Sequence, residues 1–198
     1  RRARRNRLRE AAAPHVSGVL ARLTRQLHLD RPAVRAWMLY DWANSAMYVV
    51  IVTAIFPTFF SAVAAQGLPP VEATYRFSLA TTLGLTIIAV LSPILGAIAD
   101  HSAAKKRLLG AFLVFGATAV AAMFFIRHGQ WVFAALLFIL ANIGVNGSFV
   151  FYDSLLPHVA AADDIDQVSA RGFAMGYAGG GLLLAANVAM IALGPKLW

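Results

Sequence analysis

The 198-residue chain contains no cysteine, which excludes disulfide bonds and thiolate metal sites. Charged residues are also scarce, at 13% of the sequence against about 25% in an ordinary soluble domain. No HExxH or GxSxG sequence is present, and the five histidines are scattered along the chain. We therefore expect no enzymatic activity, no cofactor and no bound metal.

Apolar residues are abundant, at 60% of the sequence, and the mean hydropathy is +0.68. A soluble core could bury one uncharged helix of about 20 residues, the length that crosses a bilayer, but this chain holds several. The composition therefore predicts an all-α integral membrane protein with five transmembrane helices. Their expected ranges are about 37–65, 77–99, 108–126, 131–152 and 165–194.

The basic residues predict the topology. Lys105, Lys106 and Arg107 lie in a short polar loop, 96–108, between the second and third spans, and loops rich in Lys and Arg stay cytoplasmic. Alternation then puts the N-terminus in the cytoplasm and Trp198 on the outer side. Residues 1–36 form a basic tail, which is either disordered or an amphipathic helix on anionic lipid. Without stacking aromatics or a recognition motif, this tail is not expected to bind nucleic acid.

The first span carries three polar residues, Asp41, Asn44 and Tyr48, on one helical face near its cytoplasmic end. A carboxylate inside the hydrocarbon is costly and usually marks a partner or a transport pathway. The alternative is that Asp41 lies just outside the hydrocarbon and remains solvated. The sequence leaves both interpretations open.

The fourth span carries Asn142 and Asn146 one helical turn apart, close to the expected midplane, with Asp153 following on the same face. A buried carboxamide without a partner costs on the order of a few kcal/mol. These two side chains are therefore expected to contact either a substrate or a neighbouring helix.

The fifth span begins after an acidic loop and repeats glycine every four residues, at Gly172, Gly176 and Gly180. This spacing gives a smooth face on which another helix can approach closely, and packing alone is enough to explain it. Arg171, at the inner end, is the nearest candidate counter-ion for Asp41 and Asp153.

Several stretches resemble a known family. The spacing of Gly96, Asp100, Lys105 and Leu108 is similar to the loop signature of major facilitator superfamily transporters, G-x-x-x-D-R-x-G-R-K-x-x-L. His101, Ala103 and Ala104 depart from it. The stretches 40–60, 151–160 and 169–180 resemble one branch, the vacuolar amino-acid effluxer associated with autophagy and its bacterial relatives. Gly172, Gly176, Gly180 and Gly181 also fit the antiporter signature G-x-x-x-G-P-x-x-G-G, with Tyr177 at its proline.

The resemblance implies a secondary transporter of two six-helix halves, of which this chain would supply five helices as a fragment lacking the C-terminal half. It implies that a small solute, such as an amino acid, crosses the bacterial inner membrane by alternating access. Asn44, Tyr48, Asn142 and Asn146 would line the cavity, and Asp41 and Asp153 would be coupling or gating carboxylates. Asp100 and the basic residues 105–107 would form a cytoplasmic latch.

The expected partners are the solute, membrane lipid and the absent half of the same protein. The alternative is a membrane scaffold or lipid-interacting helical bundle without transport activity.

Overall fold

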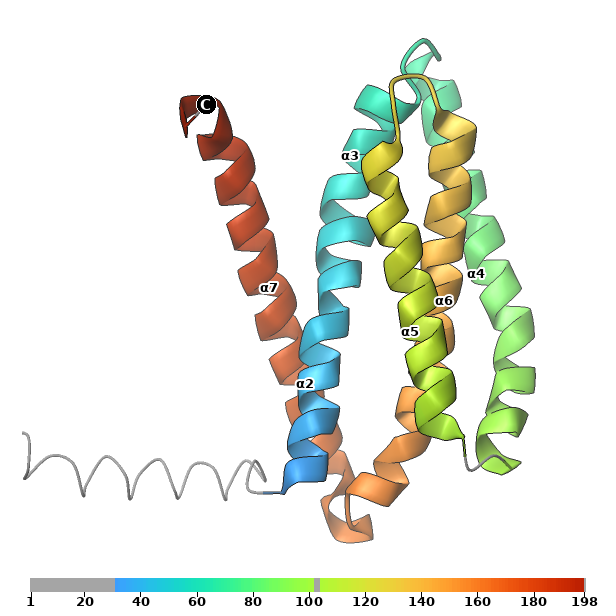
Figure 1. Cartoon of the computed structure of the whole chain (residues 1–198), viewed down its shortest axis with the longest axis vertical. Helices are drawn as coiled ribbons and strands as arrows, with labels where there is room; N and C mark the ends of the chain where they lie inside the picture. Colours follow the sequence, from blue (N-terminus) through green and yellow to red (C-terminus); the bar gives the residue numbers. More distant parts are fainter. Residues whose placement is uncertain (1–30, 102–103, 198) are drawn as a thin grey trace, which may run out of the picture.

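The structure, a computed structural model, describes residues 31–101 and 104–197, with side chains to Gly194. Within these residues the chain folds into helices, and five of them are long and apolar enough to cross a membrane (Figure 1). The predicted all-α membrane architecture with five spans is thus confirmed. The amphipathic helix considered for the N-terminal tail lies outside the described residues.

The first span is one helical rod with changing hydrogen-bond geometry. It consists of α2 (Pro32–Ala46), π-helical η1 (Met47–Ile55), α3 (Phe56–Phe59) and π-helical η2 (Phe60–Ala64). Pro57 has no N–H to donate and lies between the two π-helical stretches. π-Helical turns widen the backbone and are frequent at functional sites.

The other spans are regular helices. They are α4 (Pro70–His101), α5 (Lys105–Ala122) with the 3-10 turn η3 (Met123–Phe125), α6 (Trp131–Val159), and α7 (Ile165–Leu197), which follows the 3-10 turn η4 (Ala162–Asp164). The helices extend beyond several of the expected spans: α2 begins within the range expected for the tail, α4 starts before residue 77, and α6 continues beyond residue 152. Most of the described part of the polar loop 96–108 is also helical. Apolar runs mark the hydrocarbon, whereas backbone hydrogen bonding continues through the polar interface.

The central helix of the bundle is α6. Half of its most apolar stretch is buried, compared with 11–22% in the other spans. Small residues allow this: a Cβ added to Gly144 of α6 would lie 2.5 Å from the backbone nitrogen of Gly116 in α5. Both α4 and α5 pack closely on α6. The side chains of α6 therefore contact several other spans.

The fifth span packs on the first. α7 contacts α2 through its glycine-rich part and then leans away from it toward the C-terminus (Figure 1). The bundle has two ends. We call the end where α2 and α5 begin, at Pro32 and Lys105, the Lys105 end, and the end where α6 begins the Trp131 end. At the Lys105 end, Arg31 forms a 3.0 Å ion pair with Asp164, which joins the start of the first span to the start of the fifth.

Candidate functional site

A cavity of about 230 Å³ lies between the first span, α6 and α7. We call it the Asp41 cavity. It is lined by one acid, three hydroxyl-bearing residues and three apolar side chains: Asp41, Ser45, Tyr48, Val49, Phe149, Phe173 and Tyr177. Ligand pockets typically have this mixture of apolar walls and a few polar groups. Its volume is below the roughly 300–1,000 Å³ of drug-sized pockets, so these walls alone would enclose only a small molecule.

Asp41 is the acid of this cavity and has only 4% of its surface exposed. Its side chain faces α7, where a Cβ added to Gly176 would lie 2.7 Å from Asp41 Oδ2. No hydrogen bond or ion pair within residues 31–101 and 104–194 involves the carboxylate. A buried acid in a membrane span is expensive unless something pairs with it. The chemistry of Asp41 therefore favours a proton or a polar ligand as its partner.

Two tyrosine hydroxyls join the first span to α6 beside the cavity. Tyr48 Oη donates a 2.7 Å hydrogen bond to Asn146 Oδ1, and Asn146 Nδ2 donates to the Asn142 carbonyl at 2.8 Å. Nearer the Lys105 end, Tyr40 Oη donates a hydrogen bond to Ser148 Oγ at 2.7 Å. These bonds fix the orientation of the cavity walls across two separate spans.

An aromatic stack that includes Tyr40 lies between the cavity and the Lys105 end. The Tyr152 ring lies between Trp37, at a centroid distance of 4.4 Å, and Tyr40, at 4.9 Å. The indole Nε1 of Trp37 also donates to the Tyr152 carbonyl at 3.3 Å. Stacked rings of this kind pack tightly, so they join the first span to α6 between the cavity and the Lys105 end.

Three buried side-chain atoms lack a hydrogen-bond partner among the described residues. They are Asn44 Nδ2 in α2, Tyr152 Oη in α6 and Arg171 Nη1 in α7. All three can donate hydrogen bonds, and leaving a buried donor unpaired costs about 1–3 kcal/mol. These three donors, like the Asp41 carboxylate, would be stabilised by water or by a polar solute.

The glycines of α7 determine how closely this helix approaches the first span. Side chains at Gly176 and Gly180 would lie 2.5 Å from Ser45 Oγ and 2.7 Å from Val49 Cγ2 respectively. A side chain at Gly172 would meet the Trp37 ring. This close approach brings Phe173 and Tyr177, each next to a glycine, to the edge of the cavity.

Other residues singled out in the sequence do not line this cavity. Asn142 is buried, but its Nδ2 donates to the Phe138 carbonyl of its own helix at 2.8 Å, and it does not line the cavity. Asp153 is exposed on α6. Arg171 Nη2 donates to Gln167 Oε1 at 3.0 Å, and within the described part of the chain it forms no ion pair with Asp41 or Asp153.

Four residues of the cavity were not singled out in the sequence: Ser45, Phe149, Phe173 and Tyr177. Ser45 lies one helical turn after Asp41, and Phe149 lies one turn after Asn146. Helical spacing from the polar residues could therefore have identified these two. Phe173 and Tyr177, which follow the α7 glycines, could be found only once it was known that these glycines pack on the first span.

Comparison with known families identifies the chain. A family model described as "Vacuole effluxer Atg22 like" matches residues 30–196. The chain belongs to this family. The resemblance seen in stretches 40–60, 151–160 and 169–180 is thereby confirmed, and it extends over nearly the whole described part of this Atg22-like chain.

Individual proteins with transporter or Atg22 names also match the chain. The Atg22-like chain is 38% identical over 159 residues to the uncharacterized MFS-type transporter YxiO of Bacillus subtilis (strain 168), across 80% of this chain and 37% of that protein. It is 36% identical over 107 residues to autophagy-related protein 22 of Neurospora crassa, across 54% of this chain and 14% of that one. The chain thus matches well under half the length of these relatives. No solved structure matches it.

The residues of the expected latch lie at the Lys105 end of the Atg22-like chain. Asp100 is exposed at the end of α4, and no ion pair within the described residues involves it. Lys105 Nζ instead donates to the Ser154 carbonyl of α6 at 3.4 Å. Lys106 lines a cavity of about 370 Å³ beneath the aromatic stack, and Arg107 is exposed. The cluster thus contacts α6, while residues 102 and 103 lie outside the described part.

Proposed function

We propose that this chain is part of a secondary transporter that moves a small solute, such as an amino acid, by alternating access, and that the Asp41 cavity forms part of its path. The observation that carries the proposal is the buried Asp41 carboxylate, which faces a small cavity without a protein partner. The transporter names of YxiO and of the family agree with it.

The polar groups around the cavity suit a small polar solute. Asp41 offers an acceptor for an ammonium group or a proton, while Tyr48 and Ser45 offer hydroxyl groups. Phe149, Phe173 and Val49 offer apolar contact to the rest of the molecule. In this proposal Asp41 is the coupling or solute-binding carboxylate, and Tyr48 with Asn146 holds the wall against which the solute binds.

The membrane orientation is part of the same proposal. The Lys105 end carries Arg31, Arg35 and the basic residues 105–107, whereas the Trp131 end carries Arg76 and Arg127. The excess of basic residues at the Lys105 end favours the cytoplasm for that side. The solute path would then run from the cytoplasm through the Asp41 cavity toward the Trp131 end.

The test is solute flux in proteoliposomes that contain the full-length protein, with radiolabelled amino acids as probes. We expect Asp41→Asn to reduce flux at least about tenfold, because the cavity loses its only carboxylate. The matched control is Asp166→Asn, an exposed acid in the first turn of α7, which should leave flux unchanged. Unchanged flux in Asp41→Asn would overturn the role of the cavity. Absence of flux in the wild type would favour the scaffold alternative.

A further inference from the structure

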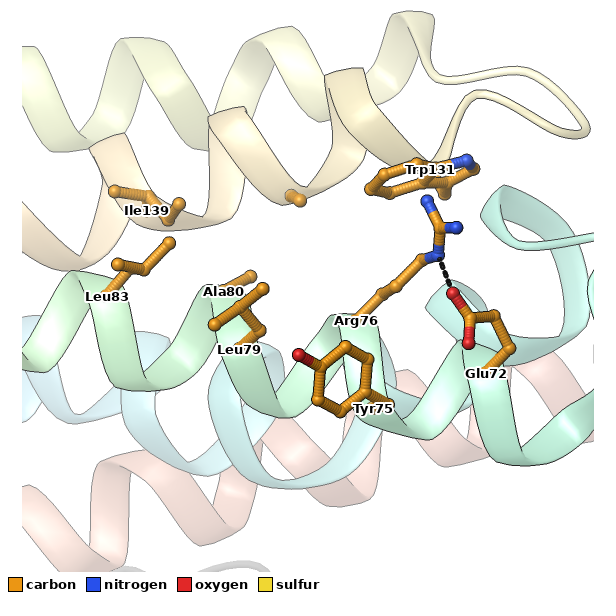
Figure 2. Close-up of a pocket in the computed structure, with 9 residues that line it drawn as sticks. Glu72, Tyr75, Arg76, Leu79, Ala80, Leu83, Trp131 and Ile139 are labelled. Carbon is orange, nitrogen blue, oxygen red and sulfur yellow. Dashed lines mark hydrogen bonds and ion pairs between the residues drawn. The ribbon is translucent and has the colours of Figure 1, made fainter.

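A second cavity, of about 250 Å³, lies between α4 and α6 near the Trp131 end (Figure 2). We call it the Arg76 groove. Its α6 side includes Trp131 and Ile139. Ile139 is two helical turns from Asn146, so the two lie on the same face of α6. The groove therefore lies on the α6 face that carries Asn146, the hydrogen-bond partner of Tyr48, whereas the Asp41 cavity itself meets α6 at Phe149.

The charged group of this groove is the guanidinium of Arg76, and two neighbours fix its position. Arg76 Nε donates a 2.6 Å hydrogen bond to Glu72 Oε1, one turn earlier in α4. Its central carbon lies 3.8 Å from the centroid of the Trp131 ring. Figure 2 shows the guanidinium held between the carboxylate and the indole. A cation over an aromatic face is stabilised by about 0.5–2 kcal/mol.

These contacts leave part of the guanidinium available. They use its Nε and one of its flat faces, and no hydrogen bond within the described residues involves Nη1 or Nη2 of Arg76. The side chain remains 28% exposed. Arginine presents its N–H groups as a rigid fork that matches the two oxygens of a carboxylate. Because the fork is already fixed in place, less side-chain entropy is lost when it binds an anion.

Apart from the Tyr75 hydroxyl, the rest of the groove is apolar. Leu79 and Leu83 follow Arg76 by about one and two turns of α4, and Ile139 faces them from α6 (Figure 2). A ligand that placed an anionic group at Arg76 could therefore bury a short apolar chain along these side chains. The groove is too small for the two acyl chains of a phospholipid, and Glu72 would repel a doubly charged phosphate. A small monocarboxylate with an apolar chain fits both limits.

We propose that the Arg76 groove is a second binding site, in which the Arg76 fork holds the carboxylate of a small amphiphilic solute and Leu79, Leu83 and Ile139 contact its apolar chain. Its place on the solute path rests on the proposed function, because the α6 face that carries Ile139 also carries Asn146, which bonds Tyr48 of the Asp41 cavity. Binding to the groove is nevertheless measurable without transport.

The experiment is calorimetric titration of the chain in phosphatidylcholine nanodiscs with butanoate and hexanoate. Hexanoate should bind more tightly, by about fourfold for each methylene buried in the groove. The uncharged analogue hexanamide should bind at least about tenfold more weakly than hexanoate. Arg76→Gln and Arg76→Lys should both weaken hexanoate binding about tenfold or more, since lysine keeps the charge and loses the fork. Arg127→Gln, at the same end of the bundle, is the control and should change nothing.

A second variant tests the site even if the arginine variants do not fold. Leu83→Trp fills the apolar part of the groove and leaves Arg76, Glu72 and Trp131 in place, and it should abolish the advantage of hexanoate over butanoate. Equal binding of hexanoate and hexanamide, or hexanoate binding that is indifferent to both Arg76→Gln and Leu83→Trp, would overturn the site. So would quenching of Trp131 fluorescence by brominated phosphatidylcholine that hexanoate does not relieve, because lipid would then occupy the groove.

Flux in the full-length protein separates the two proposals. If hexanoate binding fails while flux still depends on Asp41, the Arg76 groove is wrong and the proposed function stands. If hexanoate binds through Arg76 while the wild-type protein moves no solute, the groove stands as a binding site and the proposed function fails.

Discussion

Tyr48 Oη donates a 2.7 Å hydrogen bond to Asn146 Oδ1 and so joins the π-helical part of the first span to the middle of α6. The same tyrosine lines the Asp41 cavity. In an alternating-access transporter, the contacts between spans hold the cavity walls in one arrangement. This bond is therefore expected to matter more for the arrangement of the site than for the stability of the bundle.

Tyr48→Phe should separate these two effects. Interhelical hydrogen bonds in membranes contribute about 0.6 kcal/mol on average, so the free energy of unfolding should fall by about 1 kcal/mol or less. Solute flux should fall by several-fold, because Asn146 Oδ1 loses the bond that joins it to the first span. SDS unfolding and proteoliposome flux measure the two quantities. Thr118→Val is the control, since this exposed hydroxyl bonds only within α5 and its removal should affect neither. A loss of stability as large as the loss of flux would contradict the prediction.

Gly144→Ala tests the closest approach of two spans. The new methyl group would lie 2.5 Å from the backbone nitrogen of Gly116, and backbone atoms cannot move aside as a flexible side chain can. Overpacking of this kind costs about 1–3 kcal/mol, so SDS unfolding should occur at a lower detergent fraction. Gly110→Ala, in α5 with nothing within 4 Å of the new Cβ, should instead stabilise the helix by about 0.5–1 kcal/mol. Equal effects of the two substitutions would rule out this packing.

Gly176→Ala tests the link between the α7 glycines and the Asp41 cavity. Its Cβ would lie 2.5 Å from Ser45 Oγ and 2.7 Å from Asp41 Oδ2. Since both neighbours are polar side chains of the cavity, they would have to shift, and we expect flux to fall about tenfold. Gly181→Ala on the same helix has nothing within 4 Å and should leave flux unchanged. Normal flux in Gly176→Ala would mean that this part of α7 does not shape the site.

The sequence predicted the membrane architecture because a soluble domain of this size cannot bury several apolar runs that are each long enough to cross a bilayer. It could not predict the helix ends: Arg35 and Glu72 lie inside helices, since charged residues are tolerated where a helix extends past the hydrocarbon. The local polar signals at Asp41 and Tyr48 pointed to the cavity. Asn142 did not, because its carboxamide bonds its own helix, and a spacing rule cannot distinguish that bond from one across helices.

The Arg76 groove illustrates what local patterns miss. Glu72 and Arg76 have the spacing of a helical ion pair, so their bond could have been found in the sequence. Their position against Trp131 could not, because it depends on how α4 packs beside α6 at the far end of the bundle.

The central claim, that the Asp41 cavity is part of a water-accessible solute path, is tested most directly by Ser45→Cys in the full-length protein. This chain contributes no competing thiol, and Ser45 lines the cavity. We predict that a water-soluble maleimide labels Cys at this position, that added solute slows the labelling, and that labelling blocks flux. Thr118→Cys, on an exposed face of α5 within the membrane span, should remain unlabelled. Flux that continues unchanged after complete labelling of Ser45→Cys would contradict the account.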